Sequence, residues 1–297
     1  MISCENLMKI YKIDEDHEVM ALQGLDLQVD DGEMMAIIGN SGSGKSTLLN
    51  MLGGLDRPTA GKLIINGVDL LKLSDKDLIT YKRDTVGFIW QNNARNLIPY
   101  LTAVENVELP MLLKGRTKRE RAIQLLEMVG LKHRMNSKLS MLSGGEQQRV
   151  AIAISLANEP KLILADEPTG SVDTKTADMI LEVFRDLNQK LGVTIVIVTH
   201  DLELTKKMDR IVAIRDGKTS SEIIKRSYPE ATFNQEDVSN GNNNQETHDE
   251  YAVLDSAGRV QVPREYLTSI GMEKSNRVKI TLESGRIVLV NPKNDIK

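Results

Sequence analysis

The fold is decided by one stretch of sequence, Met34-Met35-Ala36-Ile37-Ile38-Gly39-Asn40-Ser41-Gly42-Ser43-Gly44-Lys45-Ser46-Thr47. Its apolar beginning predicts a buried strand, its glycines and serines predict a tight loop, and a helix is expected from about Lys45. The last nine residues fit the pattern G-x-x-x-x-G-K-[ST] in the strand-to-helix context that this pattern requires. The alternative is a glycine-rich turn that matches by chance, and the flanking strand and helix argue against it.

This loop predicts a binding site for the phosphates of a nucleotide. Glycines let the backbone wrap closely around phosphate oxygens, and the loop N–H groups and the helix N-terminus supply positive potential. We expect Lys45 to reach the β- and γ-phosphates of the nucleotide and the Ser46 hydroxyl to ligate Mg²⁺. The predicted nucleotide-binding residues of the loop are Gly39, Asn40, Ser41, Gly42, Ser43, Gly44, Lys45, Ser46 and Thr47.

Outward from the loop, strand and helix patterns alternate as in an α/β fold. Residues 162–165 and 193–198 are continuously apolar and predict buried strands of a mainly parallel sheet, and residues 174–191 between them have helical spacing. From about residue 92 to 159 the pattern becomes mostly helical, which predicts a helical insertion between two core strands.

Two carboxylates follow the predicted strand at residues 162–165. Ligands of open parallel sheets bind beyond the carboxyl ends of strands, so Asp166 is an expected Mg²⁺ ligand and Glu167 is expected to deprotonate an attacking water. The alternative is that the pair merely caps the next helix, and the phosphate loop favours the catalytic interpretation.

The octet Leu142-Ser143-Gly144-Gly145-Glu146-Gln147-Gln148-Arg149 is a second glycine-bearing turn that leads into a helix. It is a second potential anion site, for which Ser143, Gly144, Gly145 and Glu146 are the candidate residues. One nucleotide per chain does not need two phosphate sites, but a head-to-tail dimer does. Read in isolation, Ser143 is simply a helix N-cap.

The octet resembles the signature motif of the ABC ATPase family, and the resemblance extends over about residues 1–224. It implies a fold of the α/β class with a P-loop NTPase core, formed by residues 1–226 with a helical subdomain at about 92–159. It also implies that ATP and Mg²⁺ are bound and that ATP is hydrolysed between two such domains. Lys45 is then a catalytic residue as well.

Further residues match family elements in the expected order. Gln91 resembles the glutamine that senses Mg²⁺ and the attacking water, His200 the histidine that contacts the γ-phosphate, and Tyr11 the aromatic residue that stacks on adenine. The stretch Ser171-Val172-Asp173 resembles the loop that crosses to the partner subunit. Taken singly, these would be a surface glutamine, a structural histidine and a packing tyrosine.

Residues 53–61, 96–99 and 101–107 resemble the MacB/LolD/FtsE branch, whose ATPases pair with separate four-helix permeases. The partners implied are integral-membrane permease subunits and a second ATPase domain, at the cytoplasmic face of the cell membrane. The sequence departs from the branch at Asn92-Asn93-Ala94-Arg95, which adds two residues near the expected permease contact.

Composition and charge limit the classes to which the protein can belong. The 297 residues carry a net charge of −4, which argues against a general nucleic-acid binder, and one cysteine, which fits a reducing compartment. No apolar run approaches the ~20 residues of a membrane-spanning helix. A translation or DNA-repair ATPase is the alternative, but such chains carry two ATPase domains or long coiled coils.

The C-terminal part is predicted to be a flexible linker, residues 227–250, followed by a small domain, residues 251–297. Residues 254–265 and 267–271 resemble the swapped-hairpin domain of the AbrB/SpoVT type, an intertwined dimer that often binds DNA. Arg259 and Arg264 are the candidate DNA contacts, but Thr268 and Ser269 stand where paired basic residues are usual. Tethering of two ATPase chains is therefore favoured over DNA binding.

Overall fold

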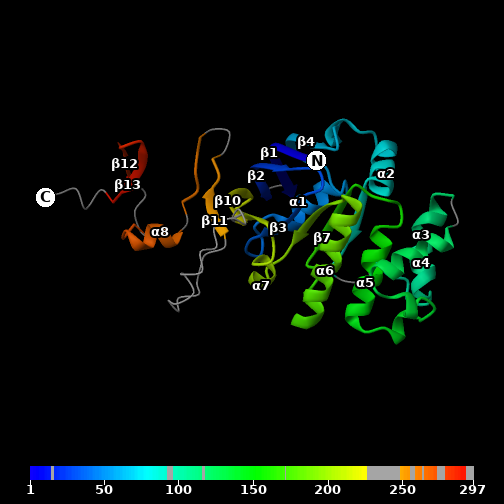
Figure 1. Ribbon diagram of the computed structural model, residues 1–297. Coiled ribbons are helices and arrows are strands. Elements are labelled where there is room, and N and C mark those ends of the chain that lie inside the picture. The colour runs from blue at the N-terminus through cyan, green and yellow to red at the C-terminus, as the bar shows by residue number, and fades with distance from the viewer. Residues whose placement is uncertain are drawn as a thin grey trace, which may run out of the picture. The chain divides into compact units, whose positions relative to one another are not determined.

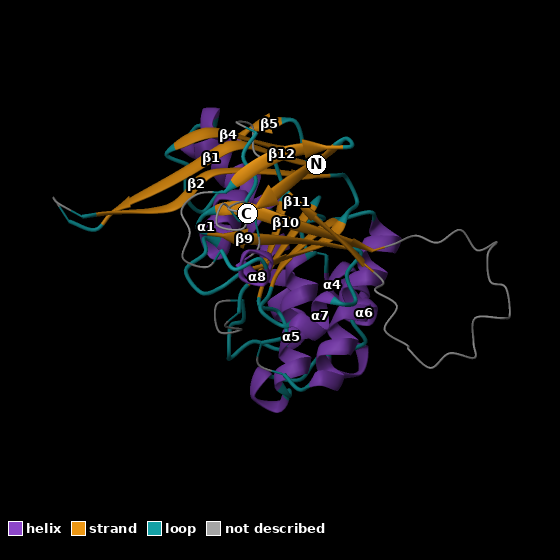
Figure 2. Cartoon of the chain, turned by 90° about the vertical axis from the view of Figure 1, so that its left-hand side faces the viewer, coloured by secondary structure: helices purple, strands orange, loops and turns teal. Residues whose placement is uncertain are grey.

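The computed structural model describes residues 1–14, 17–91, 96–115, 118–170, 172–225, 248–254, 258–262, 264–272 and 278–291. They belong to two compact units, Met1–Tyr251 and Ala252–Lys297, each of which is described by itself. In the first unit, a central sheet lies between a smaller antiparallel sheet and a layer of helices (Figures 1 and 2).

The central sheet of the described residues has the strand order β11-β10-β9-β3-β8-β7-β6. Strands β9, β3, β8, β7 and β6 pair in parallel, as the sequence predicts, and β10 is antiparallel to β9. Parallel strands are covered on both faces, which is why all five residues of β8 are buried. The bounds are β3 Met34–Ile38, β6 Val86–Ile89, β7 Leu162–Asp166, β8 Thr194–Val198, β9 Arg210–Arg215, β10 Lys218–Lys225 and β11 His248–Ala252.

The second sheet is antiparallel, and no sequence pattern used above predicts it. Its order is β2-β1-β4-β5, with bounds β1 Ile2–Lys12, β2 Glu18–Val29, β4 Ala60–Ile65 and β5 Val68–Asp69. The register of β1 against β2 shifts three times, between Cys4 and Leu7, Leu7 and Met8, and Lys9 and Ile10. Such irregularities interrupt the simple alternation of apolar and polar residues by which a half-buried strand is identified.

The helices of the first unit occupy two places. Helix α1 (Lys45–Leu52) packs between the two sheets. Helices α5 and α6 pack on the other face of the central sheet, and α3 and α4 pack in turn against α5 (Figure 1). The remaining bounds are α2 Asp75–Asp84, α3 Ala103–Leu113, α4 Arg119–Met128, α5 Gly144–Ser155, α6 Thr174–Leu191 and α7 Leu202–Thr205, with short 3₁₀ turns at Leu70–Lys72, Lys132–Arg134 and Leu139–Met141. No helix of the described ranges has the length and apolar character needed to cross a bilayer.

Helix α6 has the bounds that its sequence predicts, and its ends show why. The Asp173 side chain accepts the backbone N–H of Thr176 at 3.0 Å and so caps the first turn. At the other end, Gly192 takes up a left-handed conformation with φ of 63°, and its N–H donates to the Asn188 carbonyl. The apolar stripe of the helix then packs against the central sheet.

Cys4 allows the packing between the two sheets to be tested. It lies in β1, is 1% exposed, and has its pKa raised to about 12 by burial, with the charge of Asp26 adding to the effect. The thiolate is the reactive form, so at about pH 8 we expect the native thiol to react with a disulfide reagent at least ~100-fold more slowly than in the urea-unfolded chain. Absorbance of the released thiol measures both rates, and equal rates would contradict the buried position.

The second unit contains helix α8 (Arg264–Ser269) and a hairpin of β12 (Lys279–Glu283) with β13 (Arg286–Val290). The predicted linker needs a correction at its end. Residues 248–250 belong to β11, which hydrogen-bonds to β10 as the edge strand of the central sheet. The asparagine-rich part of the predicted linker, residues 240–245, lies outside the described residues.

Candidate functional site

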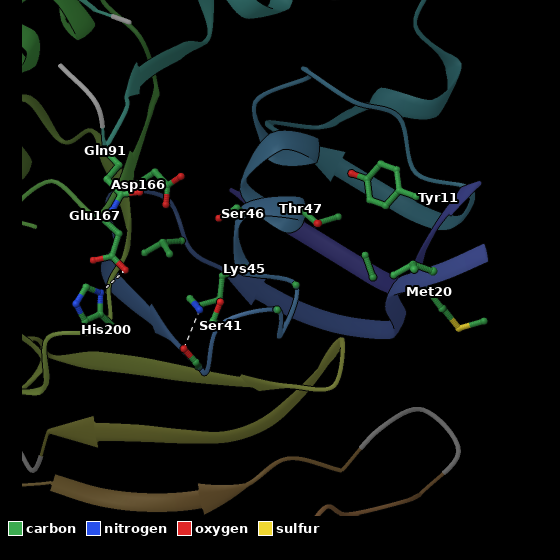
Figure 3. A pocket seen from close by; sticks show the side chains of 16 residues that line it. Tyr11, Met20, Ser41, Lys45, Ser46, Thr47, Gln91, Asp166, Glu167 and His200 are labelled. Carbon is green, nitrogen blue, oxygen red and sulfur yellow. Dashed lines mark hydrogen bonds and ion pairs between the residues drawn. The ribbon is translucent and has the colours of Figure 1, made fainter. Parts of the chain in front are cut away.

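A cleft of about 550 Å³ opens where β3, β7 and β8 end. Figure 3 shows Tyr11 and Met20 at one end of it, Gln91, Asp166, Glu167 and His200 at the other, and Lys45 with Ser41 between them. The structure therefore gathers most of the predicted site residues in one place. The lining consists of Tyr11, Val19, Met20, Ala21, Gly39, Ser41, Gly42, Gly44, Lys45, Ser46, Thr47, Gln91, Asp166, Glu167, Val198 and His200.

The loop between β3 and α1 holds its shape through close backbone approaches. The backbone of Gly39 passes so near β9 that a Cβ there would lie 2.3 Å from the Ile214 carbonyl oxygen, which no side chain tolerates. The Lys45 ammonium folds back over the loop and donates to the carbonyls of Gly39 and Asn40 at 2.7 and 2.9 Å. A cation thus lies at the N-terminus of α1, beside backbone N–H groups, which is an arrangement that attracts phosphate.

Two predicted loop residues, Asn40 and Ser43, do not line the cleft. The Asn40 carbonyl accepts the Ser43 N–H at 3.1 Å and closes the turn. The Ser43 hydroxyl is buried and has no hydrogen-bond partner among the described residues. Their positions give Asn40 and Ser43 a place in shaping the loop, and the buried hydroxyl leaves hydrogen-bonding capacity next to an anion-binding backbone.

The acidic end of the cleft is built on an unusual backbone. Asp166 is the last residue of β7, and Glu167 follows it with a left-handed φ of 49° while its N–H donates to the Val198 carbonyl at 2.9 Å. This conformation is strained for a residue other than glycine, and such strain is concentrated at functional sites. The helix that follows is capped by Asp173, so neither carboxylate acts as its N-cap, contrary to the structural alternative.

Glu167 and His200 form a pair in this end of the cleft. The Glu167 Oε1 atom lies 2.7 Å from His200 Nδ1, and the Glu167 side chain is only 11% exposed whereas that of His200 is 71% exposed. The hydrogen bond with Glu167, together with its charge, raises the pKa of His200. The imidazole therefore holds its proton to a higher pH than a free histidine would, with Glu167 as the carboxylate that stabilises it.

Gln91 and Tyr11 complete the cleft from opposite sides. Gln91 follows β6 and its Nε2 lies 3.9 Å from the place where a Cβ on Gly170 would stand, so its amide faces the turn after Glu167. Tyr11 comes from β1, is 36% exposed, and donates its hydroxyl proton to Asp56 at 2.8 Å. The partner-crossing stretch predicted at residues 171–173 is only partly described, since Ser171 lies outside the described residues.

Four lining residues were missed by sequence reasoning, namely Val198 at the end of β8 and three residues of β2. The β2 residues are Val19, Met20 and Ala21. They belong to the cleft because β2 runs beside the loop, where a Cβ on Gly44 would come within 2.6 Å of the Ala21 carbonyl. Nothing local in the sequence marks them, since their role depends on a strand from the antiparallel sheet that is packed over a distant loop.

The residues Ser143 to Glu146 do not line the cleft of their own chain. They form the N-terminus of α5, where Ser143 Oγ accepts the Glu146 N–H and Glu146 in turn accepts the Ser143 N–H at 2.8 Å. Hydrogen bonding to the Ser143 backbone lowers the pKa of Glu146 and keeps it charged. Within one chain this is a capping box, the structural alternative that the sequence left open.

Comparison with known proteins agrees with this geometry. Residues 22–170 match the family model described as ABC transporter. The chain is 44% identical over 235 residues to the uncharacterized ABC transporter ATP-binding protein MJ0796 of Methanocaldococcus jannaschii, an alignment that covers 77% of this chain and 99% of that protein. This chain is an ABC transporter ATP-binding protein. Solved structures extend the match, since the dimeric post-hydrolysis state of MJ0796 bound to ADP and Pi is similar with a TM-score of 0.69 and 42% identity, covering 77% and 100% of the two chains.

The type of ABC protein is also indicated. The macrolide export ATP-binding/permease protein MacB of Rhodopirellula baltica is 45% identical over 232 residues, which are 76% of this chain and 34% of that protein. This ABC ATPase is thus of the MacB/LolD-like type that the sequence resembles, with the P-loop fold, nucleotide binding and ATP hydrolysis of its family. The AbrB-type resemblance of residues 251–297 stays a prediction.

Proposed function

We propose that this chain is the ATP-hydrolysing subunit that drives separate integral-membrane permease chains from the cytoplasmic face of a cell membrane. One observation carries the site-level proposal: a single cleft brings together the phosphate loop, the Asp166–Glu167 strand end, Gln91 and His200. The ABC membership and the MacB-like relative, itself an ATP-binding/permease protein, support the permease as partner.

In this proposal each polar group of the cleft has one task. Lys45 leaves the loop carbonyls and contacts the β- and γ-phosphates, while the loop N–H groups hold the phosphate oxygens. Glu167, which is largely buried and oriented by His200, accepts a proton from the water that attacks the γ-phosphorus. Tyr11, at the far end of the cleft, stacks on the base (Figure 3).

The donors near Lys45 also suit a magnesium ion. Ser46, Asp166 and Gln91 offer a hydroxyl, a carboxylate and an amide oxygen, which are hard oxygen ligands of the kind Mg²⁺ prefers. When bound with ATP, Mg²⁺ would neutralise charge that develops on the phosphates. The chain itself needs to supply only a few ligands, because Mg²⁺ retains several waters and phosphate oxygens in its coordination shell.

We further propose that two chains pair head to tail, so that the N-terminus of α5 in one chain closes the cleft of the other. The residues Ser143 to Glu146 lie outside their own cleft, so any contact they make with a nucleotide must be with a partner's. A helix N-terminus favours an anion, and the dimeric structure of the similar cassette supports the pairing of two chains.

A mixing experiment tests the shared site. Lys45→Ala removes the phosphate contact, whereas Gly144→Glu places a carboxylate on the turn, where a Cβ would meet no atom within 4 Å in its own chain. Each variant alone is expected to be inactive. A mixture should regain activity, up to about a quarter of the wild-type rate, because half of random dimers carry one intact composite site.

Gly144→Ala is the matched control and should stay active, since it adds a methyl group without charge. Phosphate release is measured at several protein concentrations. A Gly144→Glu chain that hydrolyses ATP at the wild-type rate, or a mixture that regains nothing, would contradict the head-to-tail site.

For the second unit we propose an AbrB-like tether that pairs with the same unit of a second copy. One face of its hairpin is wholly apolar, because Ile280 pairs with Leu289 and Leu282 with Ile287. Three of these side chains are 65%, 78% and 76% exposed, namely Ile280, Leu282 and Ile287. A two-stranded hairpin in so small a unit is only marginally stable alone, and pairing would bury this face.

The substitution Leu282→Asp tests whether the second unit pairs with a second copy, and a DNA-binding assay tests the alternative role. In the full chain without nucleotide, Leu282→Asp should turn a dimer into a monomer in analytical ultracentrifugation, whereas Thr281→Asp on the other face of β12 should not. Binding of the wild-type chain to labelled duplex DNA at low ionic strength, falling steeply as salt is added, would instead favour a regulatory role. A wild-type chain that is monomeric under all these conditions would end the tether proposal.

A further inference from the structure

Behind Tyr11 lies a cluster of polar groups that the proposed function does not use. The Lys9 ammonium lies 4.8 Å from the centre of the Tyr11 ring and donates to Asp56 Oδ1 at 2.6 Å. Asp56 also accepts the Tyr11 hydroxyl at 2.8 Å and the Arg57 backbone N–H at 2.7 Å. One carboxylate thus holds both the end of the phenol and the cation over its face.

The cluster joins two elements that are far apart in the sequence. Lys9 and Tyr11 both belong to β1, on either side of the register shift between Lys9 and Ile10, and the contact of the ammonium with the ring shows that their side chains lie together. Asp56 lies in the loop after α1, the helix that begins at the phosphate loop. The ring is therefore anchored to the loop that follows the helix of the phosphate site.

The cation over the ring is not part of the cleft wall. Tyr11 lines the cleft but Lys9 does not, and the Lys9 side chain is only 12% exposed. A second donor contact, from Lys9 to the Arg57 carbonyl at 2.8 Å, fixes the ammonium there. The face of the ring opposite Lys9 is then the one available to a base in the cleft.

The charges needed for this arrangement are maintained. Partial burial acts to raise the pKa of Asp56, but the hydrogen bonds from Lys9, Tyr11 and the Arg57 backbone outweigh it and lower that pKa. Burial, and then the bond to Asp56, raise the pKa of Tyr11, so the phenol stays a proton donor. The cluster is thus an ion pair and a neutral ring at ordinary pH.

We propose that Lys9 and Asp56 are positioning residues for base recognition: they hold the Tyr11 ring flat against one wall of the cleft and polarise it, which strengthens its stacking on an electron-rich purine. The ring needs no reorientation when the nucleotide binds, so little side-chain entropy is lost. A cation over one face of a ring is attracted by its π-electrons, and the withdrawn electron density makes the other face a better partner for adenine. The inference rests on the proposed stacking of Tyr11 on the base.

Lys9→Met tests the proposal, because it removes the charge and keeps most of the side-chain volume. Calorimetry should show the Kd for ATP rising about five-fold, within the range of a partly buried cation–π contact. The Kd for inorganic tripolyphosphate, which has no base, should change less than about two-fold. At saturating ATP the turnover number should be unchanged, so the effect would appear in KM alone.

Two further variants distinguish positioning from a general structural role. Lys62→Met removes the exposed ion pair of Lys62 with Glu5 from the same sheet and should alter neither Kd. In a Tyr11→Leu background, Lys9→Met should have no additional effect on ATP, since the ring through which it acts is gone.

The outcomes are separable. If Lys9→Met weakens the binding of ATP and of tripolyphosphate equally, the cluster only supports the fold and the inference is wrong. The same conclusion follows if Lys9→Met has its full effect on ATP binding in the Tyr11→Leu background. If Tyr11→Leu leaves ATP affinity unchanged, the stacking assignment of the proposed function fails first. If Tyr11→Leu weakens ATP binding but Lys9→Met does not, the inference about Lys9 is wrong, whereas the stacking of Tyr11 on the base still stands.

Discussion

Glu167→Gln is expected to stop steady ATP hydrolysis while leaving ATP bound. The substitution keeps the shape of the side chain and an oxygen that can accept the His200 N–H, but the amide cannot take a proton from water. Loss of a general base typically costs about 10²–10⁴-fold in rate, so turnover should fall by at least ~100-fold. Size-exclusion chromatography should then show an ATP-dependent dimer that persists because product formation is blocked.

Glu159→Gln is a matched control for this variant. Glu159 also has a left-handed backbone, with φ of 58°, but it follows α5 and does not line the cleft. Its substitution is expected to leave turnover within about two-fold of wild type, because exposed changes away from a site have small effects. Undiminished turnover in Glu167→Gln would show that another group takes the proton.

The second large effect concerns stability. Phe184 lies in α6, is fully buried, and packs in the apolar cluster between the helices and the central sheet. Phe184→Ala should lower the free energy of unfolding of the first unit by about 4 kcal/mol, since it removes apolar contact and leaves a cavity. Urea unfolding followed by the fluorescence of Trp90, the single tryptophan, measures this loss.

Met179→Ala on the same helix serves as the comparison. Its side chain is 40% exposed, so we expect a loss of less than about 1 kcal/mol. Similar losses for the two variants would mean that Phe184 is not enclosed as the structure has it. ATP affinity of folded Phe184→Ala protein should stay near wild type, because the side chain does not line the cleft.

The sequence predicts those parts of the fold whose structure is determined by a short, continuous stretch of residues. Strands β3, β7 and β8 are continuously apolar because both of their faces are buried, and α6 carries its own caps at Asp173 and Gly192. The antiparallel sheet escapes prediction because bulges break its alternation and because its strands pair over long distances. Long-range pairing leaves no mark on a short window of sequence.

The same distinction holds for the site. The phosphate loop and the carboxylates Asp166 and Glu167 are each contiguous in sequence, and the structure brings them to one cleft. The contribution of β2 was missed because it arises only when the strand crosses the loop. Local pattern also cannot decide the role of Ser143 to Glu146, since one chain shows a capping box and the proposed second role needs a partner.

The pairing of β11 with β10 has a practical consequence for shortened forms of this protein. The strand that completes the rim of the central sheet comes from residues 248–252, after the polar stretch at 226–247. A chain cut before residue 248 would leave one side of β10 with bare amide and carbonyl groups. Unpaired sheet edges of this kind recruit strands from other molecules. Aggregation of an isolated ATPase fragment would therefore reflect the missing strand and not a defective catalytic core.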